Sequence, residues 1–250
     1  MKKHFFPNTI LQIIVALIFS LILTTPWLFV INSQNQETKI LLFFILMTLT
    51  FIVIIHLINW KRKVKLSYNF TLINSKSLLL LITILFLFEF GINIPINSFF
   101  NESNINPFTP LTMTFGVLII GPILEEMIFR GIILKGLLIS YSAKKAIIIS
   151  AILFGLIHGK PLLILPAIII GLFFGWIYYK TKSLGTTIVL HSITNLFALS
   201  GVFLIQKLKI YSSFYQFSSY RIISILISFI ILTFIFKILY IKSNKTIASL

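Results

Sequence analysis

The side chains best suited to chemistry are two adjacent glutamates followed by an arginine, Glu125, Glu126 and Arg130, within one hydrophobic stretch. At the centre of a membrane each such charge costs about 2.5–3.5 kcal/mol on insertion scales, so charges at this depth indicate function by default. Glu126 and Arg130 stand at i and i+4, and we expect them to share a helix face and to pair. Glu125 lies about 100° further round the helix and is left without that partner.

Two histidines and an asparagine in later hydrophobic stretches complete the set. His158 ends a short apolar run, and Gly159 directly after it is a helix-stop signal. His191 and Asn195 stand at i and i+4, so they face the same way on a helix. The other two histidines of the chain, His4 and His56, are interpreted as bystanders.

A carboxylate, an imidazole and an amide together can activate water: the carboxylate takes the proton, the imidazole orients or polarises, and the amide stabilises an oxyanion. Glutamate and histidine are equally a plausible zinc set, and both readings point to hydrolysis. A buried Glu–Arg pair that only fixes helix packing is the alternative. The chain has no Asp and no Cys, which excludes aspartyl and cysteine catalysis, and it lacks His-Glu-x-x-His and Gly-x-Ser-Gly.

The elements that must position these residues are membrane helices. Hydrophobic residues make up 58% of the 250 residues and charged residues 10%, whereas soluble domains average about 45–50% and about 25%. Mean hydropathy is +1.05. These values exclude a soluble or disordered chain and predict an all-α, polytopic integral membrane bundle. We expect about eight transmembrane helices, at Leu11–Ile31, Ile40–Trp60, Ser77–Ile96, Leu111–Ile139, Ala146–His158, Leu162–Tyr179, Leu184–Ile205 and Ile222–Ile241.

The long fourth stretch contains Gly121-Pro122, which predicts a break or kink. A helix that restarts at Pro122 would place both glutamates in its first turns, where the helix dipole favours anions.

Basic residues are distributed unevenly between the predicted spans. Against 5 acidic residues the chain has 21 Lys and Arg, a net charge of +16. Fifteen of them fall on one side of the membrane, five on the other, and Arg130 within a span. The positive-inside rule therefore predicts a multi-pass protein of the bacterial plasma membrane with both termini in the cytoplasm, and it explains the charge without a nucleic-acid partner. The loop Gln206–Arg221 fits this pattern least well.

Three motifs in this order resemble those of the CPBP intramembrane proteases, a family that includes the type II CAAX prenyl endopeptidases and the bacterial Abi bacteriocin-immunity proteins. They are Glu125-Glu126-x-x-x-Arg130, Phe154-x-x-x-His158 and His191-x-x-x-Asn195. We expect one membrane domain over residues 1–250, with the CPBP-like catalytic core at 110–199. The N-terminal spans, residues 1–97, carry no functional signal of their own.

The resemblance implies an α-helical membrane peptidase with its site inside the bundle. By motif position, Glu125 and His158 would activate the water, and His191 and Asn195 would stabilise the oxyanion. Glu126 and Arg130 would support the site. Family members are often described as metalloproteases, and a metal-free glutamate mechanism is also proposed.

The cofactor is therefore either none or zinc, with Glu125, His158 and His191 as the possible ligands. The metal-free mechanism is favoured for two reasons. Asn195 is placed to donate to an oxyanion, and the charge of Arg130 opposes a dication unless Glu126 neutralises it.

The expected function is an intramembrane endopeptidase that hydrolyses peptide bonds in membrane-associated proteins or peptides. The Lys-, Ile- and Asn-rich composition suggests an AT-rich bacterial genome, where protein prenylation is not expected. Bacterial relatives are linked to bacteriocin immunity, pheromone maturation and surface display, and the sequence does not choose among these. The alternative is a non-catalytic membrane protein, either a bacteriocin-immunity factor or a transporter that uses the Glu–His cavity for protons.

Overall fold

The computed structural model describes residues 5–31, 36–98, 111–159, 161–207 and 218–247. The described chain is helical and contains no strand, and several of its helices are long and apolar enough to cross a membrane. The predicted fold class, an all-α polytopic membrane protein, is thereby confirmed. The chain divides into two compact units: Met1–Ile73 with Thr109–Ser192, and Asn74–Phe108 with Ile193–Leu250.

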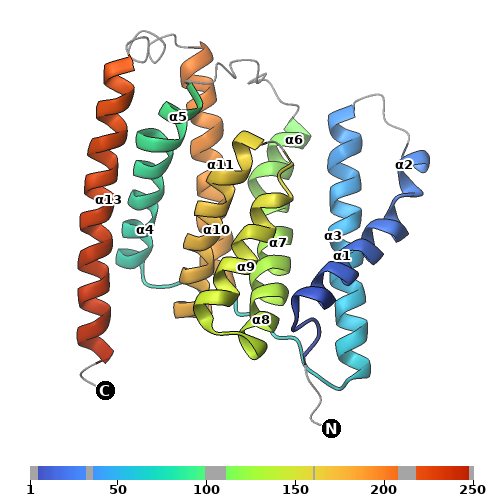
Figure 1. Cartoon of the computed structure of the whole chain (residues 1–250). Helices are drawn as coiled ribbons and strands as arrows, with labels where there is room; N and C mark the ends of the chain where they lie inside the picture. Colours follow the sequence, from blue (N-terminus) through green and yellow to red (C-terminus); the bar gives the residue numbers. More distant parts are fainter. Residues whose placement is uncertain (1–4, 32–35, 99–110, 160, 208–217, 248–250) are drawn as a thin grey trace. The chain divides into compact units, whose positions relative to one another are not determined.

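Figure 1 shows the helices in their order along the chain. Three of the segments, labelled η, have π-helical hydrogen bonding. The bounds are α1 Ile10–Thr24, α2 Trp27–Val30, α3 Gln36–Lys61, α4 Ser75–Phe88, η1 Glu89–Asn93, α5 Ile94–Ser98, α6 Leu111–Phe115, η2 Gly116–Ile120, α7 Gly121–Glu126, η3 Met127–Leu134, α8 Lys135–Ser140, α9 Ala143–Leu156, α10 Pro161–Thr181, α11 Leu184–Lys207 and α13 Ser218–Ile247.

Five helices of the described residues have the length and hydropathy of a membrane span, and they correspond to five of the eight predicted spans. They are Ile10–Val30, Thr38–Lys61, Ser75–Ile96, Leu163–Thr181 and Leu184–Gly201. The predicted fourth span is helical from α6 to α8 but interrupted by π-helical turns, and α9, the predicted fifth, has 14 residues. The predicted last span contains a shorter apolar helix, Ser219–Thr233.

The helical segment that carries Glu125 and Glu126 is continuous, where the sequence predicted a break or kink. Ile120 keeps right-handed helical dihedral angles, and the N–H of Gly121 donates to the carbonyl of Gly116, five residues back. Regular α-helical bonding resumes at Gly121 with Pro122 in the first turn, where its missing N–H costs least. Because a π-helical turn precedes this point, no free helix N-terminus faces the glutamates, and the expected dipole stabilisation is absent.

Small residues allow α9 and α10 to pack closely side by side (Figure 1). A Cβ atom at Gly171 of α10 would lie 3.1 Å from the Cα of Ala151 and 3.2 Å from the ring of Phe154. Gly175, one turn on, and Gly155 on the opposite helix make similarly tight approaches. The spacing Gly171-x-x-x-Gly175 is the one that lets membrane helices come together. The close approach brings aromatic rings of both helices toward the glutamate-bearing segment.

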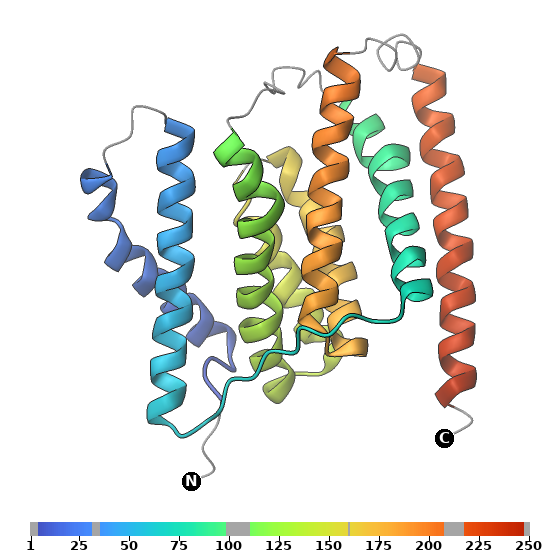
Figure 2. The ribbon, with the colours of Figure 1, turned by 180° about the vertical axis from the view of Figure 1, so that it is seen from behind.

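An extended segment, residues 64–73, follows α3 and crosses the ends of α8 and α11 (Figure 2); we call it the strap. The carbonyl of Asn69 accepts hydrogen bonds from the N–H groups of Leu184 and Gly185 at 2.7 and 3.2 Å. The N–H of Ile73 donates to the hydroxyl of Thr186 at 3.2 Å. The first two bonds satisfy N–H groups at the beginning of α11 that have no partner within that helix, and the third satisfies an N–H group of the strap.

The second unit contains α4, η1 and α5 packed against α13 (Figure 1). Gly91 makes the close approach possible, because any side chain there would overlap Ser228 of α13. The hydroxyl of Ser224 donates to the carbonyl of Gly91 at 3.3 Å. This unit also buries a carboxylate, Glu89, at 3% exposure.

Some residues considered in the sequence lie outside the described ranges, and nothing in the structure bears on them. They are Lys2, Lys3, His4, Glu102, Lys160 and the central part of the predicted loop Gln206–Arg221, residues 208–217.

Candidate active site

The centre of the first unit is a buried ion pair between Glu126 and Arg130. Nη1 of Arg130 donates to Oε1 of Glu126 at 2.8 Å, and the two side chains are 0% and 1% exposed. The predicted i, i+4 pair is therefore formed. Complete burial makes each charge dependent on the other, because an unpaired buried charge is costly.

Three groups from α9 and α10 hold the guanidinium of Arg130. Its Cζ lies 4.6 Å from the ring centre of Phe154 and 5.5 Å from that of Phe174, distances at which a cation is attracted to an aromatic face. Nη2 donates to the carbonyl of Gly171 at 3.2 Å. These contacts fix the guanidinium in place, so that it presents one nitrogen to Glu126.

His191 of α11 contacts the same carboxylate oxygen. Nδ1 of His191 lies 3.0 Å from Oε1 of Glu126, and His191 is 4% exposed. A ring nitrogen that faces a carboxylate oxygen donates to it, so Nδ1 carries a proton. Glu126 thus joins Arg130 and His191 through one oxygen and fixes the orientation of the imidazole.

Glu125 faces the opposite nitrogen of that imidazole. Oε2 of Glu125 lies 3.8 Å from Nε2 of His191, which is beyond hydrogen-bond range. Among the described residues, Oε2 of Glu125 is a buried oxygen without a hydrogen-bond partner. Buried acceptors of this kind are usually satisfied by water. A water beside this pair, rather than between the two atoms, could hydrogen-bond to both of them.

His158 lies just beyond the end of α9, and its ring packs against that of Phe154. The ring centres of His158 and His191 lie 5.0 and 5.6 Å from that of Phe154, and both rings meet it edge-on. Nδ1 of His158 lies 2.9 Å from the carbonyl of Phe154, which leaves Nε2 available. Gly159 follows with a φ of +69°, a left-handed conformation that suits glycine and ends the helix as predicted.

The last predicted site residue, Asn195, follows His191 by one turn of α11 and is half-buried. It belongs to the second compact unit, whereas the other five site residues belong to the first. Its contribution to the site stays a prediction from the i, i+4 spacing.

The π-helical turns of η3 begin immediately after Glu126 and contain Arg130. Such turns are rare, and they occur most often at functional sites. They change which carbonyl groups are paired within the helix, and the hydroxyl of Ser150 on α9 donates to the carbonyl of Phe129 at 3.2 Å. α9 therefore supports the irregular segment with a hydrogen bond as well as with aromatic contacts.

The donor set does not form a zinc site as it stands. Zinc takes about three protein ligands at about 2.0–2.2 Å from nitrogen or oxygen. Among the described residues, no three His or Glu side chains are grouped closely enough to hold an ion. Nδ1 of His191 is engaged by Glu126, and the charge of Arg130 lies within the same cluster. The mechanism that fits these contacts therefore uses the side chains alone.

Sequence reasoning found the ionisable groups but missed the residues that hold them. Phe174, Gly171 and Ser150 carry no charge, and each resembles the apolar or small residues around it. The one available signal was the Gly171-x-x-x-Gly175 spacing, which indicates close helix packing but not a carbonyl aimed at Arg130.

Comparison with known proteins shows which family this part of the chain resembles. Residues 107–197 match the model of the family described as "Type II CAAX prenyl endopeptidase Rce1-like". This segment nearly coincides with the predicted core and contains all three motifs. The match confirms the family resemblance predicted from those motifs.

Two curated relatives align with part of the same chain. "UPF0177 protein YxdF" of Lactococcus lactis subsp. lactis (strain IL1403) is 34% identical over 89 residues, 35% of this chain and 49% of that protein. "Putative membrane peptidase YdiL" of Bacillus subtilis (strain 168) is 40% identical over 81 residues, 32% of this chain and 32% of that protein. The aligned region thus spans half or less of either relative. No solved structure matches the chain.

Proposed function

We propose that this protein is an intramembrane endopeptidase of the plasma membrane that hydrolyses peptide bonds with water activated by Glu125. The observation that carries the proposal is the arrangement around one oxygen of Glu126. This oxygen binds both Arg130 and His191, and the imidazole so oriented directs Nε2 toward an unpaired oxygen of Glu125. A Glu126–Arg130 pair that only fixed helix packing would leave the buried carboxylate of Glu125 unexplained.

Glu125 is the general base in this mechanism. A water between Glu125 and the substrate donates a proton to Oε2 as its oxygen attacks the carbonyl carbon. A new C–O bond forms, the carbonyl π electrons move to oxygen, and Glu125 becomes a neutral carboxylic acid. His158, with its Nε2 free of protein hydrogen bonds among the described residues, orients the water. General base catalysis of this kind contributes roughly 10²–10⁴-fold in rate.

His191 is the electrophilic partner. With His191 protonated, the two carboxylates, the guanidinium and the imidazolium sum to zero charge, which suits a buried cluster. Nδ1–H then donates to Glu126, and Nε2–H donates to the oxyanion. We assign Asn195, one turn further on α11, as the second donor to that oxygen. Preorganised donors of this type are among the largest contributions to hydrolytic catalysis.

The second half of the reaction returns the proton. The tetrahedral intermediate collapses, the C–N bond breaks, and Glu125 gives its proton to the departing amine nitrogen. The products are a carboxylic acid and an amine, and Glu125 is again ionised. Glu126 and Arg130 touch no reacting atom in this scheme, so they act as positioning residues for His191.

The substrate class is a membrane-associated peptide or protein, because the reacting groups lie in hydrophobic helices, one of which, α11, contains the candidate span Leu184–Gly201. One relative is named a membrane peptidase, and the matched family is named for prenyl endopeptidases. Neither name specifies the peptide that this chain cleaves.

The decisive variant is Glu125→Gln, which removes the base with little change in shape. Membrane proteins and exported peptides of cells with wild-type and variant chains are compared by quantitative mass spectrometry. We expect cleavage products that disappear in Glu125→Gln and persist in Glu89→Gln, a matched control with a buried carboxylate outside the motifs. Cleavage or a cellular phenotype that is unchanged in Glu125→Gln would favour a non-catalytic immunity or transport protein instead.

Chelation tests the metal-free form of the proposal. Purified protein that retains its activity after exhaustive chelation, with no stoichiometric zinc by elemental analysis, supports the glutamate mechanism. Activity that is lost with chelator and restored by zinc would replace it with a metal mechanism.

A further inference from the structure

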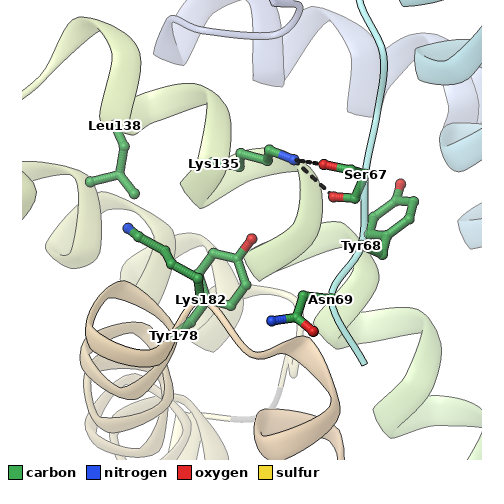
Figure 3. Close-up of a pocket in the computed structure, with 7 residues that line it drawn as sticks. All are labelled: Ser67, Tyr68, Asn69, Lys135, Leu138, Tyr178 and Lys182. Carbon is green, nitrogen blue, oxygen red and sulfur yellow. Dashed lines mark hydrogen bonds between the residues drawn. The ribbon is translucent and has the colours of Figure 1, made fainter. Parts of the chain in front are cut away.

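A second polar site lies away from the glutamates, where the strap meets the ends of α8 and α10 (Figure 3). It is a pocket with a volume of about 410 Å³, within the range of about 300–1,000 Å³ that is usual for small-molecule sites. All of its lining residues belong to the first unit. The lining residues are Ser67, Tyr68, Asn69, Lys135, Leu138, Tyr178 and Lys182.

Two lysines supply the charge of this pocket, and none of its lining residues is acidic. Nζ of Lys135 donates to the carbonyl and the hydroxyl of Ser67 at 2.8 and 3.2 Å, which fixes the ammonium at the wall (Figure 3). Nζ of Lys182 lies 4.5 Å from the ring centre of Tyr179 and makes no ion pair among the described residues. Partial burial lowers the pKa of Lys182, an effect that a bound anion would reverse.

The neutral side chains add donors rather than acceptors. Oδ1 of Asn69 accepts from the N–H of Thr71 at 3.0 Å and from its hydroxyl at 2.7 Å, so the amide nitrogen is the end turned toward Tyr178 and Lys182 (Figure 3). The hydroxyl of Tyr178 points between the two lysines (Figure 3). Tyr68 adds no donor, because its ring lies on the other side of the strap from Lys182 and its hydroxyl lies 3.4 Å from Nε2 of His56 (Figure 3).

The nearby beginning of α11 does not supply the binding groups. The N–H groups of Leu184 and Gly185 are taken by the carbonyl of Asn69, and that of Thr186 by the hydroxyl of Ser183. Recognition in this pocket therefore rests on side chains. Lysine, amide and hydroxyl donors around a cavity without a carboxylate match the chemistry of a phosphate group.

The pocket lies at the boundary of the membrane. Tyr178 is in the last turn of the candidate span Leu163–Thr181, and Lys182 follows that span directly. Leu138 adds an apolar wall beside the lysines. We propose that this pocket binds the phosphate of an anionic phospholipid headgroup, with Lys135 and Lys182 as the charged contacts. Basic pockets between membrane helices are a known means of lipid headgroup recognition.

Native mass spectrometry of the full chain tests the proposal. The protein is released from nanodiscs that contain phosphatidylglycerol and phosphatidylcholine in equal amounts, and the bound lipids are counted. We expect wild type to retain phosphatidylglycerol selectively. Because each charge-assisted bond is lost, Lys182→Gln should reduce this retention about ten-fold, and Lys135→Gln with Lys182→Gln should reduce it further. Lys180→Gln, an exposed lysine in the last turn of α10, is the control and should behave as wild type.

The other outcomes overturn the proposal. Equal losses in Lys180→Gln and Lys182→Gln would mean that only general surface charge attracts the lipid. Equal retention of phosphatidylcholine would mean that the pocket has no preference for anionic lipid. If glycerol 3-phosphate binds in the absence of phosphatidylglycerol and prevents its retention, the site takes a soluble phosphate and the assignment to lipid is wrong. Lys182→Gln alone keeps the test valid should Lys135 be needed to hold the strap.

Discussion

Among the described residues, Glu126 and Glu89 are the two most deeply buried glutamates, one in each compact unit, and their surroundings differ in kind. Glu126 has a cation at i+4, an imidazole from α11, and aromatic rings that enclose the cation. Glu89 has a neutral amide at i+4: Nδ2 of Asn93 lies 3.0 and 3.1 Å from its two oxygens. Both lie in or beside π-helical turns.

The difference shows that a local partner is enough to bury a carboxylate but not enough to build a site. The Glu89–Asn93 pair is contained within one helix. The Glu126 cluster joins α7, η3, α10 and α11, so each of its members depends on groups contributed by other helices. The variants below test this contrast, from the largest expected effect to the smallest.

Arg130→Ala should have the largest effect on stability. It leaves Glu126 as an unpaired buried charge, which costs about 3–5 kcal/mol in the free energy of unfolding. The matched change in the other unit, Asn93→Ala, removes a neutral donor and should cost only about 1–3 kcal/mol. Unfolding in bicelles with increasing denaturing detergent measures both, and equal losses would remove the distinction between the two pairs.

Removing both charges separates stability from catalysis. Glu126→Gln combined with Arg130→Gln leaves no unpaired charge, so its free energy of unfolding should exceed that of Arg130→Ala. Activity should remain roughly 10–100-fold below wild type, because the orienting carboxylate of His191 is gone. Measuring the abundance of the folded protein alongside peptide cleavage distinguishes the two effects. Recovery of full activity in the double variant would show that Glu126 does not position His191.

Glu89→Gln should have the smallest effect. An amide in place of the carboxylate still accepts a hydrogen bond from Asn93, so we expect a stability change of about 1 kcal/mol or less and wild-type cleavage. A large loss of cleavage with normal folding would show that the second unit also contributes a catalytic carboxylate.

The fold class and the ionisable residues of the candidate site could be predicted from the sequence for clear physical reasons. Membrane helices require long apolar runs, and charges within them are rare enough to mark a site. The Glu126–Arg130 pair followed from helical spacing alone. The contact of Glu126 with His191 could not be predicted, because it joins residues 65 positions apart and depends on how helices pack.

The helix that carries the glutamates contains irregular turns that residue spacing does not reveal. Counting 100° per residue assumes regular α-helical turns, whereas η2 and η3 place π-helical turns on both sides of α7. The Gly121-Pro122 pair suggested a break or kink because glycine and proline often stand where a helix ends or begins. The strap could not be predicted either, since the sequence of a connection between two spans gives no indication that its backbone caps another helix.

The strap also sets an order of events during synthesis. The hydroxyl of Ser183 bonds the carbonyl of Thr71, a residue 112 positions earlier in the chain. At about 5–20 residues per second, the strap leaves the ribosome roughly 6–22 s before its partner. During that interval the strap contacts α3, made before it, through Tyr68 and His56. α8, made in between, adds the hydrogen bonds from Lys135. The beginning of α11 then forms its hydrogen bonds with a strap that is already in place.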